Sequence, residues 1–299
     1  MPSCARTALG LVALVVGLLL GSLLYEPQLD TDALRGLRVA VTGATSGIGF
    51  EISKLYARHG ANIVLVARNE RKLREASETF FALGASKVDF VVADLSTDDD
   101  SVYAKVIADA VEKLGGGIDT LVLNHVSTSH NLVAQGWQAV RDMTVMRNLF
   151  ETNTFSHMSL THHALDPLAA SGGNIIFVSS LTGRIGVPKG AAYAATKHAM
   201  QGFLKSLRLD LLLRSVPVDI TTCTIGNIDT ASNRDAVAGT KLTEIPREKP
   251  EDAARAIVVA GQRRVRETVF PVAAVASMIW LDQIAPSIAE KVLLHVYRE

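Results

Sequence analysis

Apolar residues along this 299-residue chain fall into short runs that alternate with longer segments of helical periodicity. The short runs are bounded by polar or glycine-rich stretches and have the length of buried strands. Strands that alternate with helices predict one α/β domain with a doubly wound, parallel sheet of the Rossmann type. The predicted strands cover residues 38–41, 62–67, 88–93, 119–124, 173–179, 218–225 and 268–272.

The segments between these runs predict helices over residues 50–60, 70–83, 98–114, 133–150, 152–170 and 191–214, with another from Pro250. Residues 231–249 are polar and have no strong period, so we expect a substrate loop or lid there. Residues 273–298 have roughly helical apolar spacing, broken by Pro286. They predict a dimer, membrane-surface or lid element, with plain core packing as the alternative.

An uncharged apolar run, residues 8–24, precedes all of these elements. As a helix it would span about 26 Å, near the short limit for a bilayer core. Arg6 before the run and acidic residues after it predict an uncleaved anchor with the following domain in the lumen. A cleaved signal peptide, and hence secretion, or a buried helix are the alternatives. The predicted parts are an anchor (1–25), a linker (26–36), a catalytic domain (37–272) and a C-terminal helical extension (273–299).

Charge and cysteine content narrow the function classes. Lys and Arg number 30, as do Asp and Glu, so no global basic field favours a nucleic-acid partner. Cys4 and Cys223 lie far apart in sequence, which predicts neither a disulfide framework nor a metal site. Three histidines in the 152–170 segment lack carboxylate or cysteine partners at ligand spacing, so we expect them to be packed or solvated: His157, His162 and His163.

The first predicted strand runs directly into a glycine-rich turn and a helix, with the sequence Thr-Gly-Ala-Thr-Ser-Gly-Ile-Gly over residues 42–49. Strand, glycine turn and helix together are typical of a dinucleotide-binding site. Gly43 permits the tight turn, Gly47 lets the backbone approach a pyrophosphate, and Gly49 lets the helix pack on the strand. The predicted cofactor residues of this turn are Gly43, Thr45, Ser46, Gly47, Ile48 and Gly49.

The second strand ends at Arg68, where NAD-binding proteins carry an acidic residue for the ribose 2′-hydroxyl. Arg68, assisted by Asn69, suits instead the 2′-phosphate of NADP, with a solvated arginine at a helix start as the alternative. Asp94 and Leu95 follow the third strand. Asp94 can meet the adenine edge, or it can cap the next helix.

Two asparagines lie near the carboxyl end of the sheet, where open α/β sheets bind ligands. Asn124, His125 and Val126 follow the fourth strand and are predicted cofactor contacts. Asn153 opens the next predicted helix, where it is either a cap or part of a proton relay.

Ser180 follows the fifth strand, and Tyr193 and Lys197 lie one turn apart on one face of the next helix. A free tyrosine titrates near pH 10, and a neighbouring ammonium favours its phenolate form. A serine hydroxyl can bond the oxygen of a carbonyl or an alcohol. If a nicotinamide supplies the hydride, these residues suit reversible hydride transfer.

These motifs, in this order and spacing from about residue 37 to 272, resemble the short-chain dehydrogenase/reductase family. Within it, the segments 123–125, 179–183, 191–193 and 228–230 behind an N-terminal anchor are similar to 11β-hydroxysteroid dehydrogenase type 1 and its like-named relatives. His125-Val126 departs from the Ala-Gly of the wider family.

The resemblance implies an NADP(H)-dependent oxidoreductase of a lipophilic ketone or secondary alcohol, a steroid in that subgroup. It further implies a homodimer anchored in the endoplasmic reticulum membrane with a luminal domain. Tyr193 would be the acid/base, Lys197 would bind ribose and lower the tyrosine pKa, and Ser180 would polarise the substrate. The remaining implied contacts are a relay water held by Asn153 and the carboxamide held by Ile228 and Thr230. Alternatives are a retinoid or other lipid carbonyl as substrate, or a non-catalytic membrane-bound scaffold.

Overall fold

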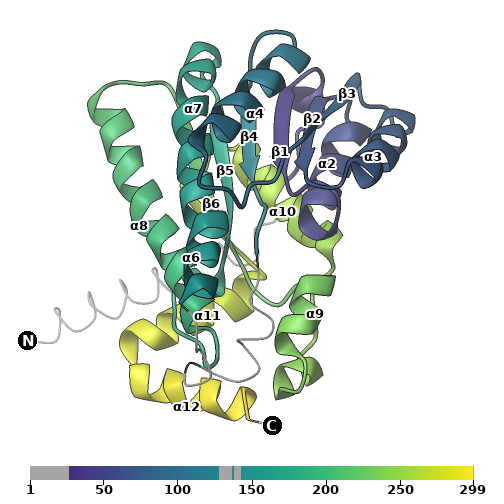
Figure 1. Cartoon of the computed structure of the whole chain (residues 1–299). Coiled ribbons are helices and arrows are strands. Elements are labelled where there is room, and N and C mark those ends of the chain that lie inside the picture. Colours follow the sequence, from purple (N-terminus) through teal and green to yellow (C-terminus); the bar gives the residue numbers. More distant parts are fainter. Residues whose placement is uncertain (1–26, 128–136, 138–142, 299) are drawn as a thin grey trace, which may run out of the picture.

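The computed structural model describes residues 27–127, 137 and 143–298, and within them the chain forms one seven-stranded sheet (Figure 1). Its strand order is β3-β2-β1-β4-β5-β6-β7, and neighbouring strands pair in parallel throughout. This confirms the predicted doubly wound, parallel sheet. The strands are β1 (Arg38–Thr42), β2 (Asn62–Ala67), β3 (Lys87–Val92), β4 (Thr120–Leu123), β5 (Asn174–Ser180), β6 (Asp219–Ile225) and β7 (Glu267–Phe270).

Helices cover both faces of this sheet, because its central strands are apolar on both sides. One core cluster joins the sheet to α2 (Gly47–Arg58), α3 (Glu70–Ala82) and α10 (Pro250–Gln262). The other joins it to α4 (Asp100–Lys113), α7 (Ser156–Ser171) and α8 (Ala191–Leu213). Two buried layers therefore fix the strands whose ends carry the predicted site residues.

Only part of the predicted helix over 133–150 lies within the described residues. Residues 128–136 and 138–142 lie outside the described part, and the helix that the structure describes is α6 (Thr144–Phe150). A π-helical turn, η3 (Glu151–Phe155), joins α6 to α7 without interruption. The sequence period does not reveal this turn, because one extra residue leaves the surrounding helical pattern almost unchanged.

Residues 231–249, predicted as a substrate loop or lid, contain two short helical elements. They form α9 (Ala231–Val237) and the 3₁₀ turn η5 (Lys241–Glu244). The side chain of Thr230 caps α9 by accepting a hydrogen bond from the amide of Asn233. Each element is too short for a helical period to emerge from the sequence.

The described part of the predicted linker, residues 27–36, is packed against the domain. It contains a 3₁₀ turn, η1 (Asp32–Leu34), and Leu34 is buried in the core. The Gln262 side chain bonds the backbone of Asp30 at both its oxygen and its nitrogen. The chain is therefore fixed to the end of α10 before β1 begins.

The C-terminal extension forms two helices, α11 (Val272–Ile284) and α12 (Pro286–Val296), separated at Ala285 as the proline predicts. Val275 and Ala289 are buried against the domain. Other apolar side chains of the pair are exposed: Trp280, Ile284, Ile288, Val292 and Leu294. Core packing therefore accounts for only part of the apolar content of this segment.

Within the described ranges, no helix has the length and apolar character needed to cross a bilayer. The predicted anchor, residues 8–24, lies outside those ranges.

Candidate active site

The predicted site residues lie along the carboxyl edge of the sheet. They lie on both sides of the point where the strand order reverses direction. The chain leaves β1 toward β2, whereas β4 lies on the other side of β1. The crevice between these diverging connections is where open α/β sheets bind ligands. The residues that follow β1, β4, β5 and β6 all reach this edge: Gly43, Asn124, Ser180 and Gly226.

The glycine-rich turn is packed so closely that side chains are excluded from it. A Cβ at Gly49 would lie 2.4 Å from both Asn124 Nδ2 and the Gly43 carbonyl oxygen. A Cβ on Gly43, at φ +66°, would lie 2.9 Å from the Cα of His125. Ser46 is the N-cap residue of α2, but its side chain makes no capping hydrogen bond. The first amides of the helix can therefore receive a phosphate, as a dinucleotide site requires.

Thr42 and Asn124 join this turn to the end of β4. The Asn124 amide nitrogen Nδ2 donates to the carbonyl oxygens of Thr42 and Gly43, at 3.2 and 3.3 Å. The backbone N–H of Asn124 donates to Thr42 Oγ1 at 2.9 Å. The predicted cofactor turn and the predicted cofactor asparagine thus form one rigid unit.

The His125 ring extends this unit toward α7. Ser156 Oγ donates to the Thr152 carbonyl, so at 2.8 Å it accepts a proton from His125 Nε2. His125 Nδ1 is then unprotonated and lies 2.9 Å from Thr42 Oγ1, whose hydroxyl also donates to the Val122 carbonyl at 3.1 Å. Burial, with Lys197 adding to it, lowers the pKa of His125 to about 3. The ring is therefore neutral, with one tautomer set by its neighbours.

His157 stacks on His125, with ring centroids 3.9 Å apart. Its Nε2 lies 3.0 Å from the His125 carbonyl, while its Nδ1 is buried without a hydrogen-bond partner in the described structure. Burial lowers the pKa of His157 as well. His157 is thus packed, as predicted, whereas His163 pairs with Asp100 at 2.9 Å on the surface.

Asn153 is fully buried in the π-helical turn. Its side-chain amide exchanges two hydrogen bonds of 2.8 Å with the backbone of Ser127, and its Nδ2 also lies 3.4 Å from Thr196 Oγ1. Its side chain therefore holds the exit of β4 against the helix that carries Tyr193. The implied role in holding a relay water stays a prediction.

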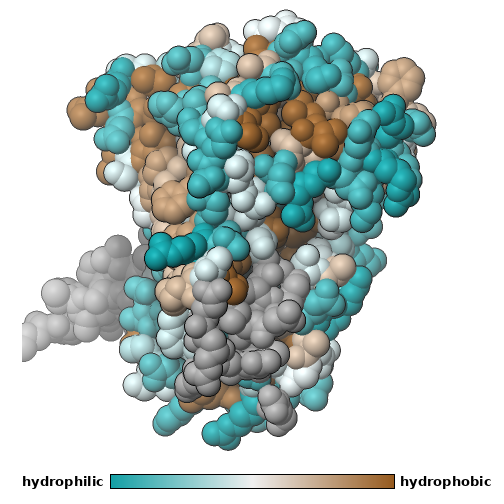
Figure 2. Space-filling view, in the orientation of Figure 1, coloured by the Kyte–Doolittle hydropathy of each residue, from teal (hydrophilic) through white to brown (hydrophobic). Residues whose placement is uncertain are grey.

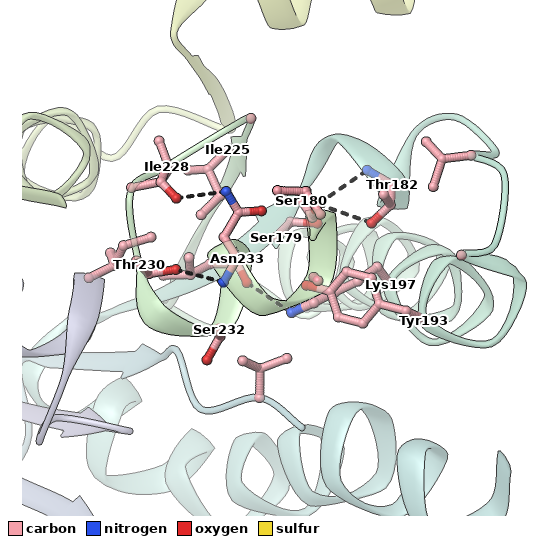
Figure 3. Close-up of a pocket in the computed structure, with 18 of the residues that line it drawn as sticks. Ser179, Ser180, Thr182, Tyr193, Lys197, Ile225, Ile228, Thr230, Ser232 and Asn233 are labelled. Atoms are coloured by element: carbon pink, nitrogen blue, oxygen red, sulfur yellow. Dashed lines mark hydrogen bonds between the residues drawn. The ribbon is translucent and has the colours of Figure 1, made fainter. Parts of the chain in front are cut away.

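Ser180 ends β5 and faces the cavity (Figure 3). Its hydroxyl oxygen accepts hydrogen bonds from the amide and the hydroxyl of Thr182, at 3.2 and 3.0 Å. Both bonds fill the acceptor positions of Ser180, so its own proton can be donated to the Tyr193 oxygen or to an oxygen in the cavity. Thr182 was not among the sequence-predicted residues, because an isolated threonine in a loop carries no pattern.

Tyr193 and Lys197 lie on one face of α8 beside Ser180, as their spacing predicts (Figure 3). Lys197 is buried; its Nζ lies 5.8 Å from the Tyr193 ring centroid and donates to the Val178 carbonyl at 3.2 Å. An ammonium has three protons, so two further donors remain for the hydroxyls of a ribose. The site therefore combines a phenol, a serine donor and a buried cation.

The pKa values of this pair differ from expectation. Burial raises the pKa of Tyr193 to about 12, and the hydrogen bond with Ser180 only partly opposes this. Burial lowers the pKa of Lys197 to about 8, so desolvation weakens the ammonium itself. Lys197 is not among the causes of the Tyr193 shift, and the lowering of the tyrosine pKa that the family resemblance implies stays a prediction. Tyr193 keeps its proton at neutral pH.

Eight of the predicted site residues line a cavity of about 210 Å³. They come from the glycine turn, the ends of β4, β5 and β6, and α8: Ile48, Asn124, Val126, Ser180, Tyr193, Lys197, Ile228 and Thr230. Thr230 also approaches the glycine turn, since its methyl group would lie 3.3 Å from a Cβ at Gly47. Distant segments of the sequence thus converge on one space.

Four predicted cofactor residues lie away from that cavity, at the ends of β2 and β3. Arg68 is exposed, and Asn69 caps α3 by accepting from the Lys72 amide at 3.0 Å. Asp94 does not cap α4, because that cap is Asp99; Asp94 instead accepts from the amide and hydroxyl of Ser96. Leu95 is buried in the core.

The cavity is also lined by residues that the sequence analysis assigned no individual role: Ser232, Asn233, Ala236, Val237 and Tyr297. Asn233 donates through Nδ2 to the Ile228 carbonyl at 2.8 Å and to Asn227 Oδ1 at 2.7 Å (Figure 3). Thr230 is of a residue type favoured at helix N-caps, but a lone threonine does not locate a helix. Tyr297 carries no signal either.

The fold and the site are typical of an oxidoreductase that uses a nicotinamide cofactor, and similarity to known proteins identifies the family. The family model for short chain dehydrogenases matches residues 38–241. Accordingly, the chain belongs to the short-chain dehydrogenase/reductase family of oxidoreductases.

Relatives with a more specific description are also similar to the chain. A hydroxysteroid 11-beta-dehydrogenase 1-like protein from Xenopus tropicalis is 40% identical over 252 residues, which cover 83% of each chain. The like-named protein of Gallus gallus is 38% identical, again over 83% of each chain. The one from Danio rerio is 35% identical over 91% of each.

Solved structures share the fold. An oxidoreductase from E. coli has a TM-score of 0.72 at 24% identity, covering 82% of this chain and 98% of its own. A short chain dehydrogenase from Shigella flexneri, complexed with NADP, has a TM-score of 0.69 at 24% identity, covering 80% and 98%.

Proposed function

We propose that this protein interconverts a ketone and a secondary alcohol on a lipophilic substrate, a steroid in the leading hypothesis, with NADP(H) as cofactor. The observation that carries the proposal is the meeting of Ser180, Tyr193 and Lys197 in one cavity beside the glycine turn. The similarity to relatives named for a hydroxysteroid supports the substrate class.

The nicotinamide, when bound, supplies or accepts the hydride. The protein's own groups manage the oxygen and its proton. In ketone reduction, the Ser180 hydroxyl donates to the carbonyl oxygen and stabilises the charge that develops there. Tyr193 gives its phenolic proton to that oxygen. The raised pKa of Tyr193 keeps the phenol in the protonated form that this step requires.

The cofactor preference follows from the end of β2. Arg68 is exposed there and carries a positive charge where an NAD-binding protein would have an acid. A guanidinium binds a 2′-phosphate through charge-assisted hydrogen bonds, and Ser46 is exposed at the start of the same crevice. Lys197 would hold the nicotinamide ribose, and the amides at the start of α2 the pyrophosphate.

The substrate cavity is predominantly apolar away from Ser180 and Tyr193. Its walls include Val126, Val187, Pro188, Ile225 and Val237. Such a lining favours a hydrocarbon skeleton with its reacting oxygen placed at the polar end.

The test is to incubate the purified protein with NADPH or NADH and a panel of 11-keto and 17-keto steroids. We expect NADPH-dependent reduction of at least one ketone. A protein that binds NADPH but reduces none of them, nor a retinal or aliphatic carbonyl, would be a non-catalytic scaffold.

The proposed assembly is a homodimer. Leu209, Leu212 and Leu213 on α8 are 66%, 60% and 85% exposed. Figure 2 shows hydrophobic surface at the upper left, where α8 ends in Figure 1. A second copy would cover this surface, since exposed contiguous leucines are unfavourable in water.

We further propose that residues 8–24 anchor the protein in the endoplasmic reticulum membrane with residues 26–299 luminal. The uncharged run and the preceding Arg6 support this orientation. A protease-protection assay on microsomes, with a C-terminal tag, tests it. The tag should survive until detergent is added; digestion without detergent would place the domain in the cytosol, and a mature N-terminus after residue 20 would indicate secretion.

A further inference from the structure

The C-terminal end of the chain returns to the substrate cavity. Tyr297 follows the last turn of α12, and its amide donates to the Leu293 carbonyl at 2.9 Å. Its side chain lines the same cavity as Ser180 and Tyr193. The phenol therefore enters the site from an element that none of the family motifs includes.

The C-terminal helices that carry Tyr297 are docked on the domain. Val275 of α11 is buried against Gly226, where an added Cβ would lie 2.8 Å from its Cγ2. Ala289 of α12 is fully buried, and α12 packs against η5 in the substrate segment. Tyr297 thus has a defined position relative to the loop that follows β6.

The hydroxyl of Tyr297 forms no hydrogen bond with any residue that the structure describes. The side chain is half-buried, and burial raises the pKa of this phenol to about 12. The cavity that Tyr297 lines is bounded by Ala236 and Val237 of α9 and by the polar side chains of Ser232 and Asn233. A phenol that lines the cavity and whose hydroxyl bonds no described residue can donate to an oxygen of a ligand there.

We propose that Tyr297 is a specificity-determining residue that hydrogen-bonds a second oxygen of the substrate, separate from the oxygen that Ser180 and Tyr193 address. The substrate class is then an apolar skeleton with two oxygens, one at the reacting carbon and one remote from it. This inference rests on the proposed function and narrows its substrate.

The experiment compares a monoketone and a diketone built on the same saturated tetracyclic skeleton, using the full-length protein and NADPH. Tyr297→Phe keeps the ring that packs in the cavity and removes only the hydroxyl. Wild type should favour the diketone in kcat/KM, and Tyr297→Phe should reduce that preference roughly three- to tenfold, mainly through KM. Leu294→Ser, on the exposed part of the same helix, is the matched control and should keep the wild-type preference.

Binding gives a readout that needs no turnover. The diketone should raise the Tm of the NADP-loaded wild type more than the monoketone does, and Tyr297→Phe should remove this difference. An unchanged diketone preference in Tyr297→Phe would overturn the inference and leave the proposed function intact. Failure of the wild type to reduce either ketone, or any other carbonyl, would overturn the proposed function and the inference with it.

Discussion

The cofactor side and the substrate side of this cavity are built differently. The cofactor side, residues 38–49 with the end of β4, is close-packed backbone in which a Cβ at Gly49 would lie 2.4 Å from its neighbours. The proposed substrate side, formed by α9, η5, α11 and α12, consists of short helices with exposed apolar side chains such as Trp280 (61%) and Ile284 (77%). We propose that the chemistry common to the family depends on rigid backbone, whereas substrate choice depends on segments that can change without disturbing the sheet.

The largest expected effect is on turnover, for a substitution at Tyr193, where the cofactor side and the substrate side of the cavity meet. Tyr193→Phe removes the proton donor while keeping the ring, so turnover should fall by about 10²- to 10⁴-fold. Cofactor binding, measured by NADPH fluorescence titration, should persist, because Lys197 and the glycine turn are unchanged. Near-normal turnover by this variant would contradict the assignment of Tyr193.

Arg68→Asp tests the cofactor side alone. The change removes a charge-assisted hydrogen bond of about 1.5–3 kcal/mol and adds repulsion toward a 2′-phosphate. The ratio of kcat/KM for NADPH over NADH should therefore fall by roughly ten- to a hundredfold. Arg71→Asp is the control, since Arg71 is paired with Glu75 on the exposed face of α3. Equal ratios in wild type and Arg68→Asp would show that another residue distinguishes the two cofactors.

The same contrast explains what the sequence could predict. β2 has the predicted bounds, Asn62–Ala67, because fully buried parallel strands appear as uninterrupted apolar runs. The positions around Ser180, Tyr193 and Lys197 were predictable because hydride transfer restricts residue type and spacing. Tyr297 and α9 were not, since their roles depend on how short helices fold back over the cavity. The tautomer of His125 depends on Thr42 and Ser156, which only the fold brings together.

Glycine substitutions measure the difference in packing directly. Gly49→Ala forces a Cβ against Asn124 Nδ2 and a backbone carbonyl, and overpacking of this kind costs about 1–3 kcal/mol. Thermal unfolding should shift down by roughly 3–10 °C. Gly202→Ala is the matched control: it lies in α8 with nothing within 4 Å of the new Cβ, so it should raise stability by up to about 1 kcal/mol. A Gly49→Ala protein as stable as wild type would show that the turn can relax.

An acid sensitivity is also expected, and it originates behind the cofactor side. In the unfolded chain His125 and His157 take up protons near pH 6.5, whereas burial and Lys197 keep both neutral in the folded protein to well below that pH. The unfolded state therefore binds more protons, and stability falls as the pH drops below 6.5.

Each such histidine contributes a loss of about 1.4 kcal/mol per pH unit below 6.5. His157→Gln removes one of the two, so its stability should decline less steeply than that of the wild type when urea unfolding is measured at pH 7, 6 and 5. The slope is the informative quantity, because loss of the stacked ring also lowers stability at pH 7. His295→Gln, which removes an exposed histidine from α12, should keep the wild-type slope. Parallel profiles for wild type and His157→Gln would show that the buried pair does not determine the acid sensitivity, and that the cofactor side owes its stability at low pH to other groups.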